Sequence, residues 1–217
     1  HHLAQKTAIT MTRKSFLLMA AAAVMAFAFT ACSETDNAAD DFPNWQAANE
    51  AYFDSIYNVA KANTAQWQVI PSITLPSEAV KNKTDNVAAE VIKAGEGSDR
   101  AFQNDTVRVI LQGRLKASPG YPKGKVFHQT YVGSDDNTTA NAAKLAVSSV
   151  APGLQTALQN MPVGAKWRVY VPYQLGFGSA TGSGTIAPSL SKTVSVPAYS
   201  TLVYTVEVVS IIRQGHK

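Results

Sequence analysis

The chain has 217 residues, of which 46% are hydrophobic and 16% are charged, a balance that excludes a disordered chain and predicts one folded domain with appendages. Its formal net charge of +4 arises mainly before Glu34, where Lys6, Arg13 and Lys14 meet no acidic residue. Because the rest of the chain is nearly balanced in charge, it lacks the basic surface that binds nucleic acid, and we expect no nucleic-acid partner.

Residues 11–32 have the pattern of a secretion signal. Met11 fits a translation start, the basic pair Arg13 and Lys14 follows it, and the apolar run 16–29 has 14 residues. A helix that spans a bilayer needs about 20 apolar residues, so this run is too short to span and instead matches the apolar part of a signal. Residues 1–10 are then upstream or vector-derived sequence.

Cys32 is the only cysteine of the chain and stands where such a signal would be cut. The segment 29–32, Phe-Thr-Ala-Cys, resembles a bacterial lipobox, in which the cysteine is acylated, although Phe29 replaces the usual leucine. We therefore expect lipidation at Cys32; the alternative is an ordinary secretory signal with a bystander cysteine. The acidic residues Glu34 and Asp36 fit either surface display or an ordinary solvated linker.

Residues 33–86 are expected to hold a tether, a helix and a connector. Helical spacing begins near Asp41, a candidate cap, and continues to Asn63. The apolar stripe of this helix is formed by Trp45, Tyr52, Ile56 and Val59. It is expected either to pack on the following domain or to form a dimer contact. The connector 64–86 contains one short extended segment, predicted at Trp67–Ile70.

From residue 87 to residue 213 the sequence is rich in predicted strands. Segments 87–97, 105–115, 166–173 and 200–212 alternate apolar and polar residues with a period of two. In the second of these, Val107, Val109 and Leu111 share one face. Only residues 153–161 have a helical pattern here. The predicted fold class is therefore α+β, with an antiparallel sheet and one short helix.

The same region carries a series of spaced motifs. A D-x-V-x-V strand occupies 105–109 and a Gly-Lys-x-Phe turn occupies 124–127. The pattern L-x-x-M-x-x-G-x-x-W-x-x-x-x-P is complete in Leu158, Met161, Gly164, Trp167 and Pro172. The last strand, where the related pattern is A-T-L-x-F-x-V-E-L, contains Leu202, Tyr204, Val206 and Glu207. In this spacing the region resembles the FKBP-type peptidyl-prolyl isomerases over about 87–213.

The resemblance implies a twisted sheet wrapped around a short helix, with an apolar pocket where Pro152 and Gly153 begin that helix. The implied reaction is rotation about an X–Pro bond, whose barrier of about 18–20 kcal/mol comes from amide resonance. A pocket that binds the twisted amide better than the planar one lowers this barrier. No acid–base group, cofactor or metal is therefore expected.

The resemblance also implies which residues form the pocket. The positions matched as catalytic are Phe127, His128, Ala151, Leu154 and Phe177, and those matched as substrate-binding are Leu111, Leu145, Val150, Val196 and Tyr204. Three leucines replace aromatic residues of the family: Leu154 a tryptophan, Leu145 a phenylalanine and Leu111 a tyrosine. Phe177 keeps the ring of a tyrosine without its hydroxyl, while the backbone N–H of Ala151 stands where the family donates to ligand.

His128 replaces an aspartate of the family, and is expected to be either a polar residue at the pocket rim or a pH-sensitive contact to substrate. Between Gly178 and Pro197 lie 18 residues, SATGSGTIAPSLSKTVSV, more than the family pattern has. Because small residues dominate this insertion, we expect a mobile loop over the pocket, which either sets substrate choice or is a tolerated extension. The segment 116–125 is predicted to be another such loop.

The resulting hypothesis is an exported, lipid-anchored prolyl isomerase or folding helper of the outer membrane, facing the periplasm or the cell surface. Its expected partners are proline-containing peptides or client proteins of the cell envelope, and the membrane through the N-terminal lipid. Because leucine offers less contact area than an aromatic ring, reduced activity is expected. The alternatives are a non-catalytic module that binds peptides or a partner, and a structural component of a surface uptake complex.

Overall fold

The computed structural model describes residues 41–187 and 192–215. The predicted signal 11–32, the lipidation residue Cys32 and the acidic residues Glu34 and Asp36 lie outside the described residues. No helix within the described ranges is long and apolar enough to cross a membrane.

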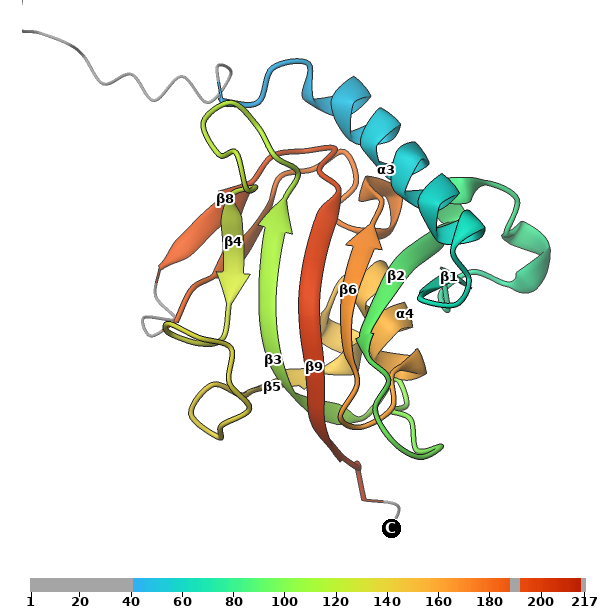
Figure 1. The fold of residues 1–217 in the computed structure, drawn as a ribbon, viewed down its shortest axis with the longest axis vertical. Coiled ribbons are helices and arrows are strands. Elements are labelled where there is room, and N and C mark those ends of the chain that lie inside the picture. Colours follow the sequence, from blue (N-terminus) through green and yellow to red (C-terminus); the bar gives the residue numbers. More distant parts are fainter. Residues whose placement is uncertain (1–40, 188–191, 216–217) are drawn as a thin grey trace, which may run out of the picture. The chain divides into compact units, whose positions relative to one another are not determined.

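The helices and strands follow one another in the order α3 (Trp45–Ala62), β1 (Trp67–Pro71), β2 (Asn86–Lys93), β3 (Thr106–Leu115), β4 (Val126–Gln129), β5 (Ala143–Ala146), α4 (Pro152–Asn160), β6 (Lys166–Val171), β7 (Gly182–Thr185), β8 (Thr193–Val196) and β9 (Leu202–Ile212). In the described part of the chain, seven strands form an antiparallel sheet in the order β1-β2-β6-β9-β3-β4, and β5 pairs with β3. The long strands β3 and β9 occupy the middle of this sheet (Figure 1). The predicted fold class, an antiparallel sheet with one short helix and an N-terminal helix, is confirmed.

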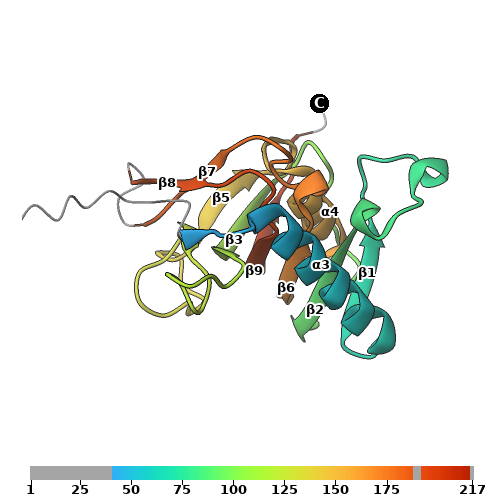
Figure 2. The same ribbon diagram turned by 90° about the horizontal axis from the view of Figure 1, so that it is seen from above.

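The two helices cover opposite faces of the sheet. Ala89 belongs to the same buried cluster as Leu158 of α4, whereas Ala88 and Tyr170 belong to a second cluster with Phe53 of α3. Neighbouring residues of a strand point to opposite faces, so β2 and β6 contribute side chains to both clusters. The pocket face therefore lies on the α4 side, and α3 packs on the other side (Figure 2).

The period-two prediction for the inner face is confirmed. Val107, Val109 and Leu111 of β3 are fully buried, as predicted. They pack in the cluster that also contains Trp167 and the residues of α4. The predicted helix 153–161 is α4, which begins one residue earlier at Pro152. Proline suits that position because its missing N–H would have no partner in the first turn.

Helix α3 differs in detail from its prediction. It begins at Trp45 and its cap residue is Asn44, in a left-handed conformation, rather than Asp41. The residues it buries are Asn49, Phe53 and Ala60. Val59 was predicted in the stripe but is 43% exposed. The buried residues Asn49, Phe53 and Ala60 are spaced by four and seven residues, so they form one face of the helix that does not include Val59. The helix packs on its own sheet, as the first of the two alternatives proposed.

Polar contacts fasten α3 to the beginning of β9. The side-chain oxygen of Asn49, which is fully buried, accepts a hydrogen bond of 2.8 Å from the backbone N–H of Thr201. The indole N–H of Trp45 donates to the Ser200 hydroxyl at 2.8 Å. The segment predicted as a connector also joins the fold, because Trp67–Pro71 is the edge strand β1. The boundary placed at residue 87 stays a prediction.

The insertion after Gly178 is not the loop that was predicted. It forms the hairpin of β7 and β8, with Gly182 opposite Val196 and Thr185 opposite Thr193. Its small residues permit close packing: a Cβ on Gly184 would lie 2.3 Å from the carbonyl oxygen of Phe127. They were therefore misread as a sign of mobility. Residues 188–191, between β7 and β8 in the sequence, lie outside the described residues.

Candidate functional site

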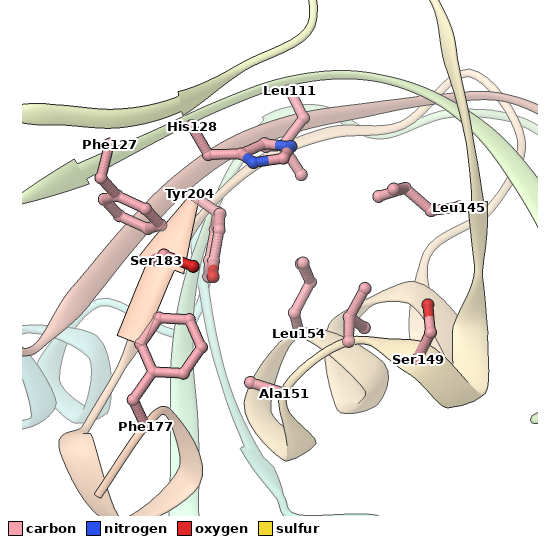
Figure 3. Close-up of a pocket in the computed structure, with 11 residues that line it drawn as sticks. Leu111, Phe127, His128, Leu145, Ser149, Ala151, Leu154, Phe177, Ser183 and Tyr204 are labelled. Atoms are coloured by element: carbon pink, nitrogen blue, oxygen red, sulfur yellow. The ribbon is translucent and has the colours of Figure 1, made fainter. Parts of the chain in front are cut away.

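A cavity of about 260 Å³ lies between the inner face of the sheet, the start of α4 and the hairpin (Figure 3). The residues that line it are Leu111, Phe127, His128, Leu145, Ser149, Val150, Ala151, Leu154, Phe177, Ser183 and Tyr204. All the residues predicted for the site are among them except Val196. Val196 is fully buried in the core, because the alternation of β8 turns Val194 and Val196 inward and leaves Thr193 and Ser195 exposed.

Two aromatic rings form the wall on the sheet side. Phe127 of β4 and Tyr204 of β9 meet edge to face, with ring centroids 5.7 Å apart and an interplanar angle of 72°. Gly113 of β3 makes room for this arrangement, since a Cβ there would lie 2.7 Å from the Phe127 ring. Gly113 pairs with Tyr204 on one side and with His128 on the other. The three neighbouring strands thus present both rings to the cavity.

The floor is the N-terminal end of α4. Leu154, in the first turn, is 3% exposed and fills the position where the sequence comparison expects a larger ring. The helix lies so close to β6 that a Cβ on Gly153 would meet Val171 at 2.3 Å. The N-cap residue is Ala151, and among the described residues nothing accepts a hydrogen bond from its backbone N–H. That donor is free for a ligand.

The opposite rim is made by Phe177 and the hairpin. Phe177 follows the 3-10 turn Tyr173–Leu175, and its ring lies against Gly182, where a Cβ would be 2.2 Å away. Ser183, the next residue of β7, faces the cavity and was not predicted. It was missed because the hairpin itself was not recognised. Ser149 was also missed; its hydroxyl is bonded to the carbonyl of Ala146 at 2.7 Å.

His128 connects the pocket to the hairpin. Its Nδ1 accepts a hydrogen bond of 3.2 Å from the backbone N–H of Thr185. This bond requires the neutral ring, because a protonated Nδ1 has no free lone pair. Burial lowers the pKa of His128 below its ordinary value of 6.5, which also favours the neutral form. Next to it, the backbone N–H of Ala187 donates to the carbonyl of Gln129 at 2.9 Å.

The lining therefore combines apolar surface with a few neutral polar groups. None of the lining residues is an Asp, Glu, Lys or Arg. Across residues 41–187 and 192–215, no group of three His, Cys, Asp or Glu side chains is arranged to hold a metal ion. Such a pocket offers an apolar ring-sized space and hydrogen-bond donors at its edge, a combination that suits a proline ring followed or preceded by amide carbonyls.

Comparison with known proteins agrees with this geometry. The family model described as FKBP-type peptidyl-prolyl cis-trans isomerase matches residues 97–209. The chain is 33% identical over 135 residues to an FKBP-type 22 kDa peptidyl-prolyl cis-trans isomerase of Escherichia coli, covering 62% of this chain and 54% of that protein. It is 28% identical over 152 residues to a protein named outer membrane protein MIP from Legionella longbeachae, covering 70% of this chain and 55% of that protein.

A solved structure also resembles the whole described fold. The crystal structure of FkpA from Escherichia coli matches with a TM-score of 0.50 at 21% identity, covering 95% of this chain and 75% of that one. The chain spans about half the length of the curated relatives it matches. The family model nevertheless covers more than half of the chain, over the strands and the helix that build the pocket. The chain therefore belongs to the FKBP-type peptidyl-prolyl cis-trans isomerase family.

Proposed function

We propose that this chain accelerates the cis-trans isomerisation of X–Pro bonds in proteins of the cell envelope, as an exported and lipid-anchored folding helper. The observation that carries the proposal is the cavity at the start of α4, which is apolar, has no charged side chain in its lining and presents the free N–H of Ala151. Its substrates are proline-containing peptides or unfolded client segments.

The physical basis is a preference for the twisted amide. Rotation about the X–Pro bond removes amide resonance, at a cost of about 18–20 kcal/mol in water. The twisted amide is less dipolar than the planar one, so it loses less on leaving water for an apolar pocket. A difference of about 1.4 kcal/mol between the two forms speeds the reaction tenfold. Catalysis of this kind requires neither a base nor a metal.

We infer that the activity is lower than an aromatic lining would give. Leu154, Leu145 and Leu111 provide the surface where the family pattern has rings. At about 25 cal/mol for each Å² of apolar surface, replacing a tryptophan by leucine at the floor weakens proline binding by about 1–2 kcal/mol. A smaller binding energy leaves less to spend on the transition state.

The test is a protease-coupled isomerisation assay on tetrapeptides that vary in the residue before proline. The proposal expects a rate that rises in proportion to the concentration of the chain and falls in Phe177→Ala. Rates equal to the uncatalysed reaction for every tetrapeptide would overturn it.

A second candidate is a non-catalytic module that holds proline-containing segments or a partner in the same cleft. The three leucines of the lining favour it, because they keep the pocket apolar while removing ring area. It predicts measurable affinity for tetrapeptides, by titration calorimetry, with no acceleration of their isomerisation. The two measurements together separate the two candidates.

The lipid anchor is proposed from Cys32 and the signal before it. The name of the Legionella longbeachae relative, outer membrane protein MIP, supports a place in the envelope. The variant Cys32→Ala should lose metabolic labelling by a fatty acid and should leave the membrane fraction. Continued labelling of that variant would exclude acylation at Cys32.

A further inference from the structure

The hydroxyl of Tyr204 is an unpaired polar group inside an otherwise apolar wall. The residue is 5% exposed and lines the cavity. No donor or acceptor among the described residues forms a hydrogen bond with its hydroxyl. In Figure 3 the ring extends from the sheet into the cavity, and its oxygen points toward the space bounded by Phe177 and Leu154.

The ring that carries this hydroxyl is held in place. Tyr204 lies in the middle of β9, paired with Gly113 of β3 and with Val169 of β6. Phe127, which is 1% exposed, packs edge to face against it. A side chain fixed on both flanks has lost most of its rotamer freedom in the free protein, so a bond from its hydroxyl costs little further ordering.

The hydroxyl is also protonated at neutral pH. Burial raises the pKa of Tyr204 well above its ordinary value of 10. A neutral phenol donates a hydrogen bond, and the acceptors of an X–Pro segment are its carbonyl oxygens. The donor and the expected ligand are therefore complementary.

The other polar groups of the lining are less suited to this contact. The Ser149 hydroxyl donates to the carbonyl of Ala146 and is engaged. The Nδ1 of His128 accepts from Thr185, so the proton of the ring is on Nε2, in a side chain that is only half-buried. Ser183 faces the cavity from the hairpin, but the residue is exposed to solvent. Phe127 and Phe177 have no polar atom. Among the free donors of the lining, the hydroxyl of Tyr204 belongs to a buried residue, and the N–H of Ala151 lies on a different wall of the same cavity.

We propose that Tyr204 binds substrate directly, by donating a hydrogen bond from its hydroxyl to a carbonyl oxygen of the bound X–Pro segment. It orients the segment together with the N–H of Ala151, one donor on each side of the proline ring. This inference rests on the proposed function for its substrate class. It goes beyond the apolar wall that the sequence comparison assigns to this position.

The experiment compares Tyr204→Phe, which removes one oxygen atom, with two matched variants of the full chain. Tyr57→Phe makes the same change on α3, away from the pocket, as the control. Ser183→Ala removes another hydroxyl of the cavity lining, so that the effects of the two hydroxyls can be compared. Each variant is measured for kcat/KM on a proline tetrapeptide, for tetrapeptide affinity by calorimetry, and for urea unfolding.

A neutral hydrogen bond contributes a factor of about 2 to 10 in an equilibrium. Tyr204→Phe should therefore lower kcat/KM and affinity about 2- to 10-fold, and by more than Ser183→Ala does, while Tyr57→Phe stays within twofold of the wild type. Its urea midpoint should not fall, because no bond within the protein is lost. Unchanged affinity and unchanged kcat/KM in Tyr204→Phe would overturn the inference, as would an equal loss in Ser183→Ala or a lowered urea midpoint that accounts for the loss.

Failure of the Tyr204 inference can be distinguished from failure of the proposed isomerase function. If the wild-type chain binds the tetrapeptide without accelerating its isomerisation, the isomerase proposal fails, and the affinities alone decide the role of Tyr204. If the wild-type chain neither binds nor accelerates, both proposals are overturned.

Discussion

The buried amide of Asn49 gives the sharpest stability prediction. This side chain is fully buried on α3, and its oxygen accepts the backbone N–H of Thr201, which is itself fully buried. Its nitrogen donates to the carbonyl of Trp45 at 2.8 Å. The substitution Asn49→Ala therefore removes the only acceptor found for the Thr201 N–H among the described residues.

The magnitude follows from that unpaired donor. A buried N–H without a partner costs about 1–3 kcal/mol. The loss of the bond to the Trp45 carbonyl costs less free energy, because this carbonyl also accepts a hydrogen bond from the backbone N–H four residues along the helix. Alanine gains at most about 0.7 kcal/mol in helix propensity over asparagine. The control Asn58→Ala shares this gain on the same helix, but Asn58 is exposed.

The assay is urea unfolding of the two variants and the wild type. We expect Asn49→Ala to be less stable than Asn58→Ala by about 1–3 kcal/mol. In a chain of this size, a loss of 1 kcal/mol lowers Tm by about 2–4 °C, so thermal unfolding checks the same difference. Equal stability of the two variants would show that Asn49 does not anchor α3 to β9, and the reasoning would be refuted.

Three further predictions concern the pocket and its hairpin. Leu154→Trp should raise tetrapeptide affinity by adding ring area at the floor, with a stability cost of about 1–3 kcal/mol measured by urea unfolding; unchanged affinity in a folded variant would mean that the lining does not limit binding. Gly184→Ala should lower stability and kcat/KM, because its Cβ would meet the Phe127 carbonyl at 2.3 Å, whereas the control Gly215→Ala meets no atom within 4 Å. For His128, burial lowers the pKa in the folded state, so the neutral ring contributes stability above about pH 6.5 that is lost as pH falls through the folded pKa. The free energy of unfolding of the wild type should therefore fall between pH 7 and pH 5 by more than that of His128→Asn, which does not titrate; parallel pH profiles would contradict this.

The regular elements were predictable because their signals are local. Alternation in β3 and β9 and the Pro-Gly start of α4 depend on a few neighbouring residues, and the structure confirms them. The pocket positions were predicted from the resemblance to the FKBP-type family, whose motifs lie in the same strands and helix. This is why Phe127, Leu154 and Tyr204 meet around one cavity.

The features that were missed depend on contacts between distant segments. Gly182 and Gly184 are small because an aromatic ring and a strand backbone press against them, which cannot be read from the hairpin alone. Asn49 is polar and was not among the residues predicted for the buried stripe, because its partner, Thr201, lies 152 residues away. Val196 belongs to β8, which pairs with the cavity-lining strand β7, but its side chain points into the core. This direction depends on the register of β7 and β8.

The central claim is that this pocket accelerates rotation about an X–Pro bond. The most direct measurement is NMR exchange spectroscopy of a tetrapeptide at equilibrium, which follows the interconversion of its cis and trans forms without a coupling protease. Uncatalysed interconversion takes tens to hundreds of seconds at 25 °C. The account predicts that substoichiometric amounts of the chain bring this exchange into the range of seconds or faster, and that Phe177→Ala slows it again. Exchange that stays at the uncatalysed rate, while the peptide is shown to be bound, would contradict the claim.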